Sequence, residues 1–178
     1  MKEMTKKEFK ESMNLNLEAH NTSEKIRGAI LSKAILLEQV ISLFICNYFV
    51  SLGKRDLFNE LVLEKEFFTF ENKIKVLEKL EIGGLMKRVR DMKGNPFRFS
   101  EDKKEFIKAI RWVREIRNAI AHKRAGLEVN EKALKIRYHF DVKDKEILLN
   151  DQFLKRFWDI TSPLSNILLN MSLKLDKQ

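Results

Sequence analysis

The residue types best suited to chemistry in this chain are Arg117, Asn118 and His122, within the stretch REIRNAIAH that spans residues 114–122. A guanidinium can hold two phosphate oxygens through paired hydrogen bonds. An imidazole titrating near neutrality can give or take a proton, and an amide can orient either group or donate to the anion. The set therefore suits proton transfer at a phosphodiester, and it equally suits simple anion binding at a helix end.

These three side chains would be enough to cleave RNA, because RNA carries its own nucleophile, the 2′-hydroxyl. A protein would then need only to move a proton and stabilise charge on the phosphate, with no metal ion. The structural alternative is that Arg117 forms a core ion pair while His122 is an exposed residue at a helix end. Both interpretations are open at this point.

The helix that positions these residues is predicted between residues 101 and 122. Ser100 is the expected N-cap, with acidic residues in the first turn, and Gly126 is the expected stop. Fraying is expected near Ala121, so that the last turn surrounds one groove. The apolar positions at helical spacing are Phe106, Ala109, Ile110, Val113, Ile116 and Ile120.

Arg117 lies at the margin of that apolar stripe, where a guanidinium is costly unless it is paired or faces a polar cleft. Glu38 has a similar position in an earlier helix, surrounded at helical spacings by Leu31, Ala34, Ile35, Ile41 and Ile45. We therefore expect Glu38 to pair with Arg117 and support it. The alternative is that Glu38 lies at the rim of its helix face and reaches water.

The motif formed by Arg117, Asn118 and His122 resembles that of the HEPN superfamily (higher eukaryote and prokaryote nucleotide-binding domains), in which an Arg, often followed by a polar residue, precedes a His by a short spacing. The resemblance implies a compact helical domain that is usually a homodimer. Many HEPN proteins are metal-independent endoribonucleases of defence or toxin–antitoxin systems, and others only bind nucleotides or protein partners. The resemblance also implies that a polar or acidic residue of the first helical hairpin, here Glu38, supports the motif Arg.

A second, weaker likeness involves residues 70–77, FENKIKVL, followed later by the motif. These residues look like the mannitol-repressor-like branch of the same superfamily. This likeness implies a non-catalytic regulatory or protein-interaction module as the alternative to an RNA-binding or RNA-cleaving protein, with an antitoxin or a regulatory protein as a possible partner.

Positive charge is abundant, with a formal net charge of +9, so RNA or another polyanion is a plausible ligand. We expect Arg111, Arg114, Lys123 and Arg124 to contact nucleic acid around the motif. A second basic cluster precedes the motif helix and extends this track, namely Lys87, Arg88, Arg90, Lys93 and Arg98. The alternative is a lysine-rich, solvated surface without a ligand.

Other chemistries receive little support from the sequence. The single cysteine, Cys46, allows no internal disulfide and no cysteine-based zinc cluster, which is consistent with a reducing cytoplasm. The three histidines lack metal-ligand spacing, and there is no Gly-rich phosphate loop. We therefore expect no metal and no cofactor. The apolar run at residues 40–52 is short for a bilayer span, so we interpret it as part of a core helix and expect no membrane association.

The predicted fold is all-α, a HEPN-like helical bundle with a small β-hairpin near residues 135–149. Residues 1–20 form an N-terminal extension, either a mobile helix or an unstructured segment, and residues 21–178 form a single domain. Further helices are expected after a capping cluster at residues 21–23, at 57–68, after Thr69 up to residues 83–84, at 85–93, and after Asp151. Alternation at residues 136–142 predicts one strand, residues 143–146 a turn, and residues 147–149 the returning strand.

Overall fold

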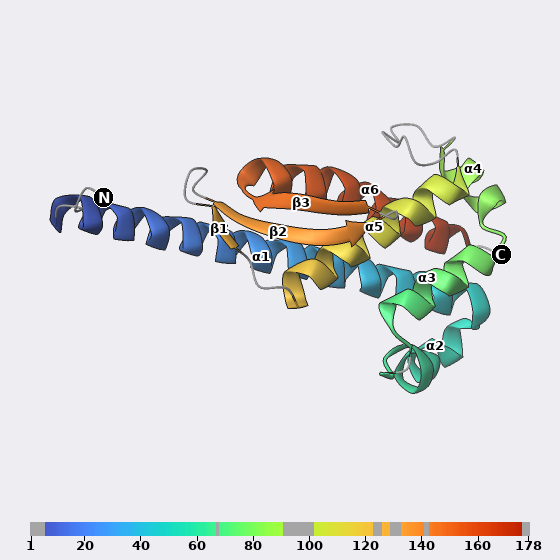
Figure 1. Cartoon of the computed structure of the whole chain (residues 1–178). Helices are drawn as coiled ribbons and strands as arrows, with labels where there is room; N and C mark the ends of the chain where they lie inside the picture. The colour runs from blue at the N-terminus through green and yellow to red at the C-terminus, as the bar shows by residue number, and fades with distance from the viewer. Residues whose placement is uncertain are drawn as a thin grey trace. The chain divides into compact units, whose positions relative to one another are not determined.

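The computed structural model describes residues 6–66, 68–90, 102–122, 126–128, 133–140 and 143–175. This part of the chain is mostly helical with a small antiparallel sheet, which confirms the expected class at that level (Figure 1). The helices are α1 (Lys6–Phe49), α2 (Arg55–Phe58), α3 (Phe70–Lys79), α4 (Gly83–Arg90), α5 (Lys103–His122) and α6 (Asp151–Leu175). A 3-10 turn covers Leu52–Lys54, and a π-helical turn covers Asn59–Leu63.

Helix α1 runs through 44 residues without a break. The expected cap at residues 21–23 is therefore wrong, since these residues are helical and Ser23 is fully buried. No proline interrupts the helix, and the preference of Asn, Thr and Ser for caps is only a weak bias that packing overrides. The side chains described between residues 10 and 22 are nearly all exposed, whereas Ile30, Leu37 and Phe44 are fully buried.

The segment after α1 departs from the helix expected at residues 57–68, because regular helix there gives way to the π-helical turn that ends at Leu63. The cap at Thr69 is confirmed: its hydroxyl oxygen accepts a hydrogen bond of 3.3 Å from the backbone N–H of Asn72. Helix α3 then stops at Lys79, so the glycine pair begins α4 at Gly83 instead of ending the previous helix.

Two predicted caps lie near, but not at, the residues expected. Asp102 caps α5, because its Oδ1 accepts a hydrogen bond of 2.7 Å from the backbone N–H of Lys104; Ser100 lies outside the described residues. For α6 the cap is Asn150, not Asp151, since its Oδ1 accepts from the N–H of Phe153 at 2.8 Å. Pro163 lies inside α6 and does not divide it.

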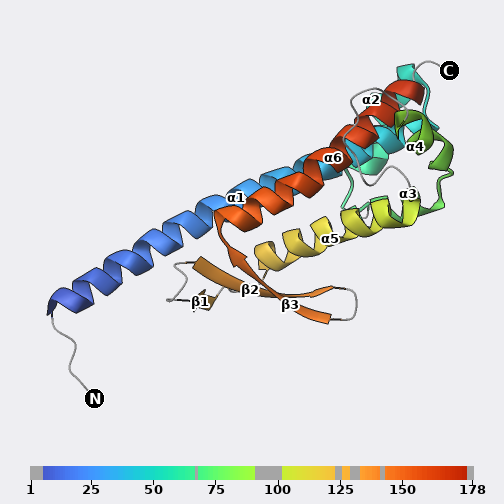
Figure 2. The same cartoon turned by 90° about the horizontal axis from the view of Figure 1, so that it is seen from above.

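The sheet consists of β1 (Gly126–Glu128), β2 (Ala133–Phe140) and β3 (Lys143–Leu149) in the order β1-β2-β3, all antiparallel (Figure 2). The predicted hairpin is confirmed, with Ile136 opposite Ile147 and both buried. The turn expected at residues 143–146 is wrong, because those residues already belong to β3. Strand β1 is an addition, and Gly126 lies in it instead of stopping α5 directly.

The chain divides into two compact units. The first comprises Met1–Ser32 and Glu115–Phe157, and the second comprises Lys33–Arg114 and Trp158–Gln178. Within Met13–Phe49, α1 is long and apolar enough to cross a membrane, with a mean hydropathy of 1.9 over an 18-residue window. Half of that window is buried inside the protein, and the core helix of a globular protein passes the same test.

Candidate functional site

The three motif residues occupy the last turns of α5, in the first unit. Arg117 and Asn118 are half-buried, and His122 is exposed. Nη1 of Arg117 donates a hydrogen bond of 3.1 Å to Oδ1 of Asn118. At 3.6 residues per turn, the three side chains leave the helix within an arc of roughly 140°. The structure thus keeps all three on one side of the helix end and orients the Asn118 amide by its neighbour.

Burial of the apolar positions sets the rotation of this helix end. Ile116 and Ile120 are fully buried and Ala119 is 3% exposed, so the remaining arc of the helix faces outwards. A helix with one buried side presents its polar residues on the other side. The apolar spacing predicted from the sequence is therefore what directs Asn118 and His122 away from the core.

A fourth residue, Arg27 of α1, holds the same helix end. Its Nη2 donates a hydrogen bond of 3.1 Å to the backbone oxygen of Ile120, and its Nη1 pairs with Glu24 at 2.8 Å. Carbonyl groups in the last turn of a helix have no partner within the helix, and a cation there also suits the helix dipole. Sequence reasoning missed Arg27, because a partner that is a backbone carbonyl far along the chain leaves no signal in residue spacing.

The arginines expected to extend a phosphate track are engaged with carboxylates instead. Nη2 of Arg111 lies 2.6 Å from Oε1 of Glu78, and Nη1 of Arg114 pairs with Oε2 of Glu71, both on α3. Their charges are compensated within the second unit, so the expected role in nucleic-acid binding is weakened for both. The sequence pattern did not reveal these pairs, because the two glutamates lie more than thirty residues away on a different helix.

The rest of the predicted basic surface is only partly described. Lys87 of α4 is exposed. Lys123 and Arg124, like Lys93 and Arg98, lie outside the described residues. The side chains of Arg88 and Arg90 are likewise not among those described.

Glu38 does not have the partner expected for it. Its Oε1 accepts a hydrogen bond of 2.9 Å from Nζ of Lys73 on α3, where an ion pair with Arg117 was expected. Glu38 thus pairs with a cation, as expected, but that cation is Lys73 and not Arg117. A signal was available, because Lys73 lies on the apolar face of α3, between Phe70 and Leu77, where it also needs a partner.

The remaining reactive groups offer little. Burial raises the pKa of the Cys46 thiol, although the positive charge of Arg55 opposes this shift. A thiol that stays protonated is a weak nucleophile and a weak metal ligand. Among the described residues, no three His, Cys, Asp or Glu side chains gather in an arrangement that could hold a metal ion.

Comparison of the chain with protein-family models, curated proteins and solved structures finds no match. The residues at the end of α5 and the charges around them are therefore the basis for assigning a function.

Proposed function

We propose that this chain is a HEPN-like protein that binds RNA and cleaves it without a metal ion, acting in the cytoplasm as a homodimer in a toxin or defence system. The observation that carries the proposal is the hydrogen-bond partner of Arg117. Among the described residues, its hydrogen bond goes to an amide, whereas Arg111 and Arg114 are both paired with glutamates. A guanidinium whose charge is not compensated, on the same helix end as an exposed His122, is suited to an anionic ligand.

The roles follow from the donor and acceptor chemistry of the three side chains. Arg117 holds the non-bridging oxygens of the scissile phosphate, and Asn118 fixes the guanidinium through its Oδ1 while its amide N–H₂ is directed to the same anion. His122 transfers the proton. The 2′-hydroxyl gives its proton to His122 as its oxygen forms a bond to phosphorus, the bond between phosphorus and the 5′-oxygen breaks, and the departing 5′-oxygen takes up the proton from His122. The products are a 2′,3′-cyclic phosphate and a 5′-hydroxyl.

The alternative proposal is a non-catalytic regulatory or protein-interaction module resembling the mannitol repressor. The pairing of Arg111 with Glu78 and of Arg114 with Glu71 favours it, because a protein that tracks an RNA backbone needs cations that are free of internal partners. This alternative predicts an intact fold and no cleavage of any RNA.

The test is a cleavage assay on structured and single-stranded RNA in the presence of EDTA. The wild-type protein should leave 2′,3′-cyclic phosphate ends. His122→Ala and Arg117→Ala should each lower the rate by about 10²–10⁴-fold, the usual contribution of a proton-transfer group or a charge-stabilising group.

The matched control is Lys104→Ala, which removes an exposed cation at the other end of α5 and should leave the rate unchanged. Cleavage that requires magnesium, or that persists in His122→Ala, would refute the assigned roles. Absence of cleavage by a folded wild-type protein would favour the regulatory module.

A further inference from the structure

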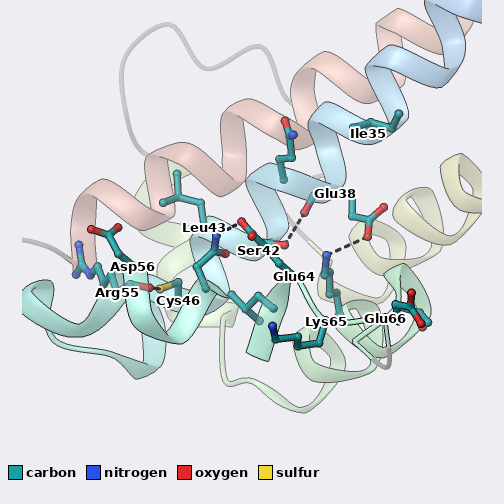
Figure 3. A pocket seen from close by; sticks show the side chains of 15 residues that line it. Ile35, Glu38, Ser42, Leu43, Cys46, Arg55, Asp56, Glu64, Lys65 and Glu66 are labelled. Atoms are coloured by element: carbon teal, nitrogen blue, oxygen red, sulfur yellow. Dashed lines mark hydrogen bonds and ion pairs between the residues drawn. The ribbon is translucent and has the colours of Figure 1, made fainter. Parts of the chain in front are cut away.

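The second unit contains a pocket of about 630 Å³ that the proposed reaction does not use (Figure 3). Its walls come from α1, from the segment between α1 and α3, and from α3 itself. Pockets of a few hundred to a thousand cubic ångströms are the usual size of small-molecule sites. Ile35, Glu38, Leu43 and Lys73 are among the residues that line it.

An ion pair between a buried lysine and a half-buried glutamate lies in the wall. The side chain of Lys73 is 9% exposed, that of Glu38 is 21% exposed, and Nζ lies 2.9 Å from Oε1. Bringing such a pair out of water costs much of what the attraction returns, so the pair is weak evidence for a purely stabilising role. Charged side chains in the wall of a pocket can, in contrast, provide the few polar groups that fix the orientation of a ligand.

This pair retains hydrogen-bonding capacity towards the pocket. Within the described residues, the charged ends of Lys73 and Glu38 make one hydrogen bond, from Nζ of Lys73 to Oε1 of Glu38. Two N–H groups of the Lys73 ammonium and Oε2 of Glu38 are therefore left to solvent or to a ligand. A ligand can displace solvent from these groups only if it offers one acceptor and one donor at matching positions.

Other polar groups of the wall are already engaged within the protein. The hydroxyl of Ser42 donates to the backbone oxygen of Glu38, and the thiol of Cys46 donates to the backbone oxygen of Arg55. Nδ2 of Asn59 donates to the carboxylate of Glu64. Glu38 and Lys73 therefore keep hydrogen-bonding capacity beyond that of these engaged groups, and the lining also includes the polar side chains of Gln39, Asp56 and Lys65.

The same wall also offers apolar surface. Ile35 and Leu43 lie on α1, one turn before and one turn after Gln39, and they remain 48% and 45% exposed. In Figure 3 both side chains are seen among the residues that line the pocket, together with Glu38. A ligand that contacts both would remove apolar surface from water while its polar edge meets the ion pair.

We propose that this pocket binds a small neutral molecule through an amide edge, with the carbonyl oxygen accepting from Lys73 and the N–H donating to Oε2 of Glu38. An apolar ring or chain of the same molecule packs against Ile35 and Leu43. A neutral amide matches both members of the pair. A carboxylate would be repelled by Glu38, and an amine would be repelled by Lys73. The proposal is independent of RNA cleavage.

A panel of three matched probes tests this chemistry: benzamide, benzoate and benzylamine share a ring and differ in the charge of the polar group. Titration of the ¹⁵N-labelled protein, followed by amide chemical shifts, should show benzamide binding at least tenfold more tightly than either charged probe. The shifted amides should be those of the pocket residues. Equal binding of all three, tighter binding of a charged probe, or shifts confined to other regions would overturn the proposal.

A double variant, Glu38→Leu with Lys73→Met, removes both charges without leaving one buried alone. It should lose at least tenfold in benzamide affinity, whereas Glu60→Gln, at an exposed glutamate outside the lining of the pocket, should keep it. Unchanged affinity in a folded double variant would overturn the assigned contacts. If the double variant does not fold, the probe panel on the unmodified protein still decides.

Discussion

At the scale of single residues, the same side chain has different chemical capacity depending on its partner. Arg111 and Arg114 are locked to glutamates of α3, and Arg117 on the same helix is hydrogen-bonded to an amide. Composition treats the three as equivalent, and spacing does not show which of them has a carboxylate partner. A guanidinium can bind an external anion only if its charge is not already compensated by an internal carboxylate. The functional proposal therefore rests on Arg117.

Arg27 provides a prediction at this scale. Its removal leaves the Ile120 carbonyl without its charged donor, so the last turn of α5, which carries His122, should open more easily. In Arg27→Ala, hydrogen exchange of the backbone amides in that turn should speed up by about fivefold, which corresponds to the loss of a hydrogen bond worth about 1 kcal/mol.

The matched control is Lys25→Ala, an exposed cation two positions away on α1, which should leave the exchange unchanged. Equal exchange rates in Arg27→Ala and the wild type would show that the contact does not hold the helix end. This measurement requires no RNA, so it stands whether or not the protein cleaves.

At the scale of elements, the hairpin of β2 and β3 has its own ionic cluster. Glu146 of β3 lies opposite Arg137, with Oε1 2.6 Å from Nε of that arginine and Oε2 3.1 Å from Nζ of Lys135. The hydrogen bond from Arg137, with that from Lys135, lowers the pKa of Glu146 below its ordinary value of 4.5. Cross-strand pairs of opposite charge support the register of an antiparallel hairpin.

The pH dependence follows from the direction of that shift. Because the folded pKa of Glu146 is lowered, its contribution to stability is complete above pH 4.5 and is lost as the pH falls through the folded pKa. Hydrogen exchange in β2 and β3, normalised for intrinsic pH effects, should therefore show that the hairpin weakens as the pH falls below about 4.5, where a carboxylate of lowered pKa takes up its proton. The effect should be small and should decrease with added salt, since the pair is exposed.

Glu146→Gln should flatten this pH dependence, because it removes the titrating group. Glu105→Gln, at an exposed position in the first turn of α5, should leave the response of the hairpin as in the wild type. A hairpin whose acid response is the same in Glu146→Gln would exclude the ion cluster as its cause.

At the scale of the whole molecule, the proposed reaction depends on assembly. One copy of the chain offers a single Arg117, Asn118 and His122 at the exposed end of one helix, which is a shallow site for gripping a phosphate. A two-fold dimer places the same patch opposite itself, so two copies of the motif can form a cleft. Bringing those positive charges together is unfavourable without an anion, which predicts RNA binding that weakens strongly with salt.

Light scattering should give twice the chain mass of 21.1 kDa, and RNA affinity should fall steeply between low and physiological salt. In a mixture of His122→Ala and Arg117→Ala proteins, a shared cleft should regain part of the activity that each variant lacks alone. A stable monomer that nevertheless cleaves RNA, or mixtures that recover nothing, would remove the composite site.

The local pattern of the sequence determined the elements and the candidate chemistry. Apolar residues at helical spacing predicted α5 and its rotation, and alternation predicted β2. The apolar run at residues 147–149 predicted only the end of β3. The types and spacing of Arg117, Asn118 and His122 marked one helix end. These inferences succeed because the periods of a helix and a strand relate residues that are close along the chain. The predicted N-caps were one or two residues away from the observed caps, Asp102 and Asn150. Several adjacent side chains at each helix start can accept a hydrogen bond from the backbone, and only their geometry selects one.

The pairing of charges was decided only by the tertiary structure. Glu38 pairs with Lys73, Glu71 with Arg114, and the Ile120 carbonyl with Arg27. Hydrophobic spacing shows that a charged residue on an apolar face needs a partner, but not which element will supply it. An ion pair forms where packing brings the side chains of two helices within a few ångströms of each other. Coulomb attraction acts between any two opposite charges, so the sequence cannot show which of the 35 lysines and arginines a given carboxylate will pair with.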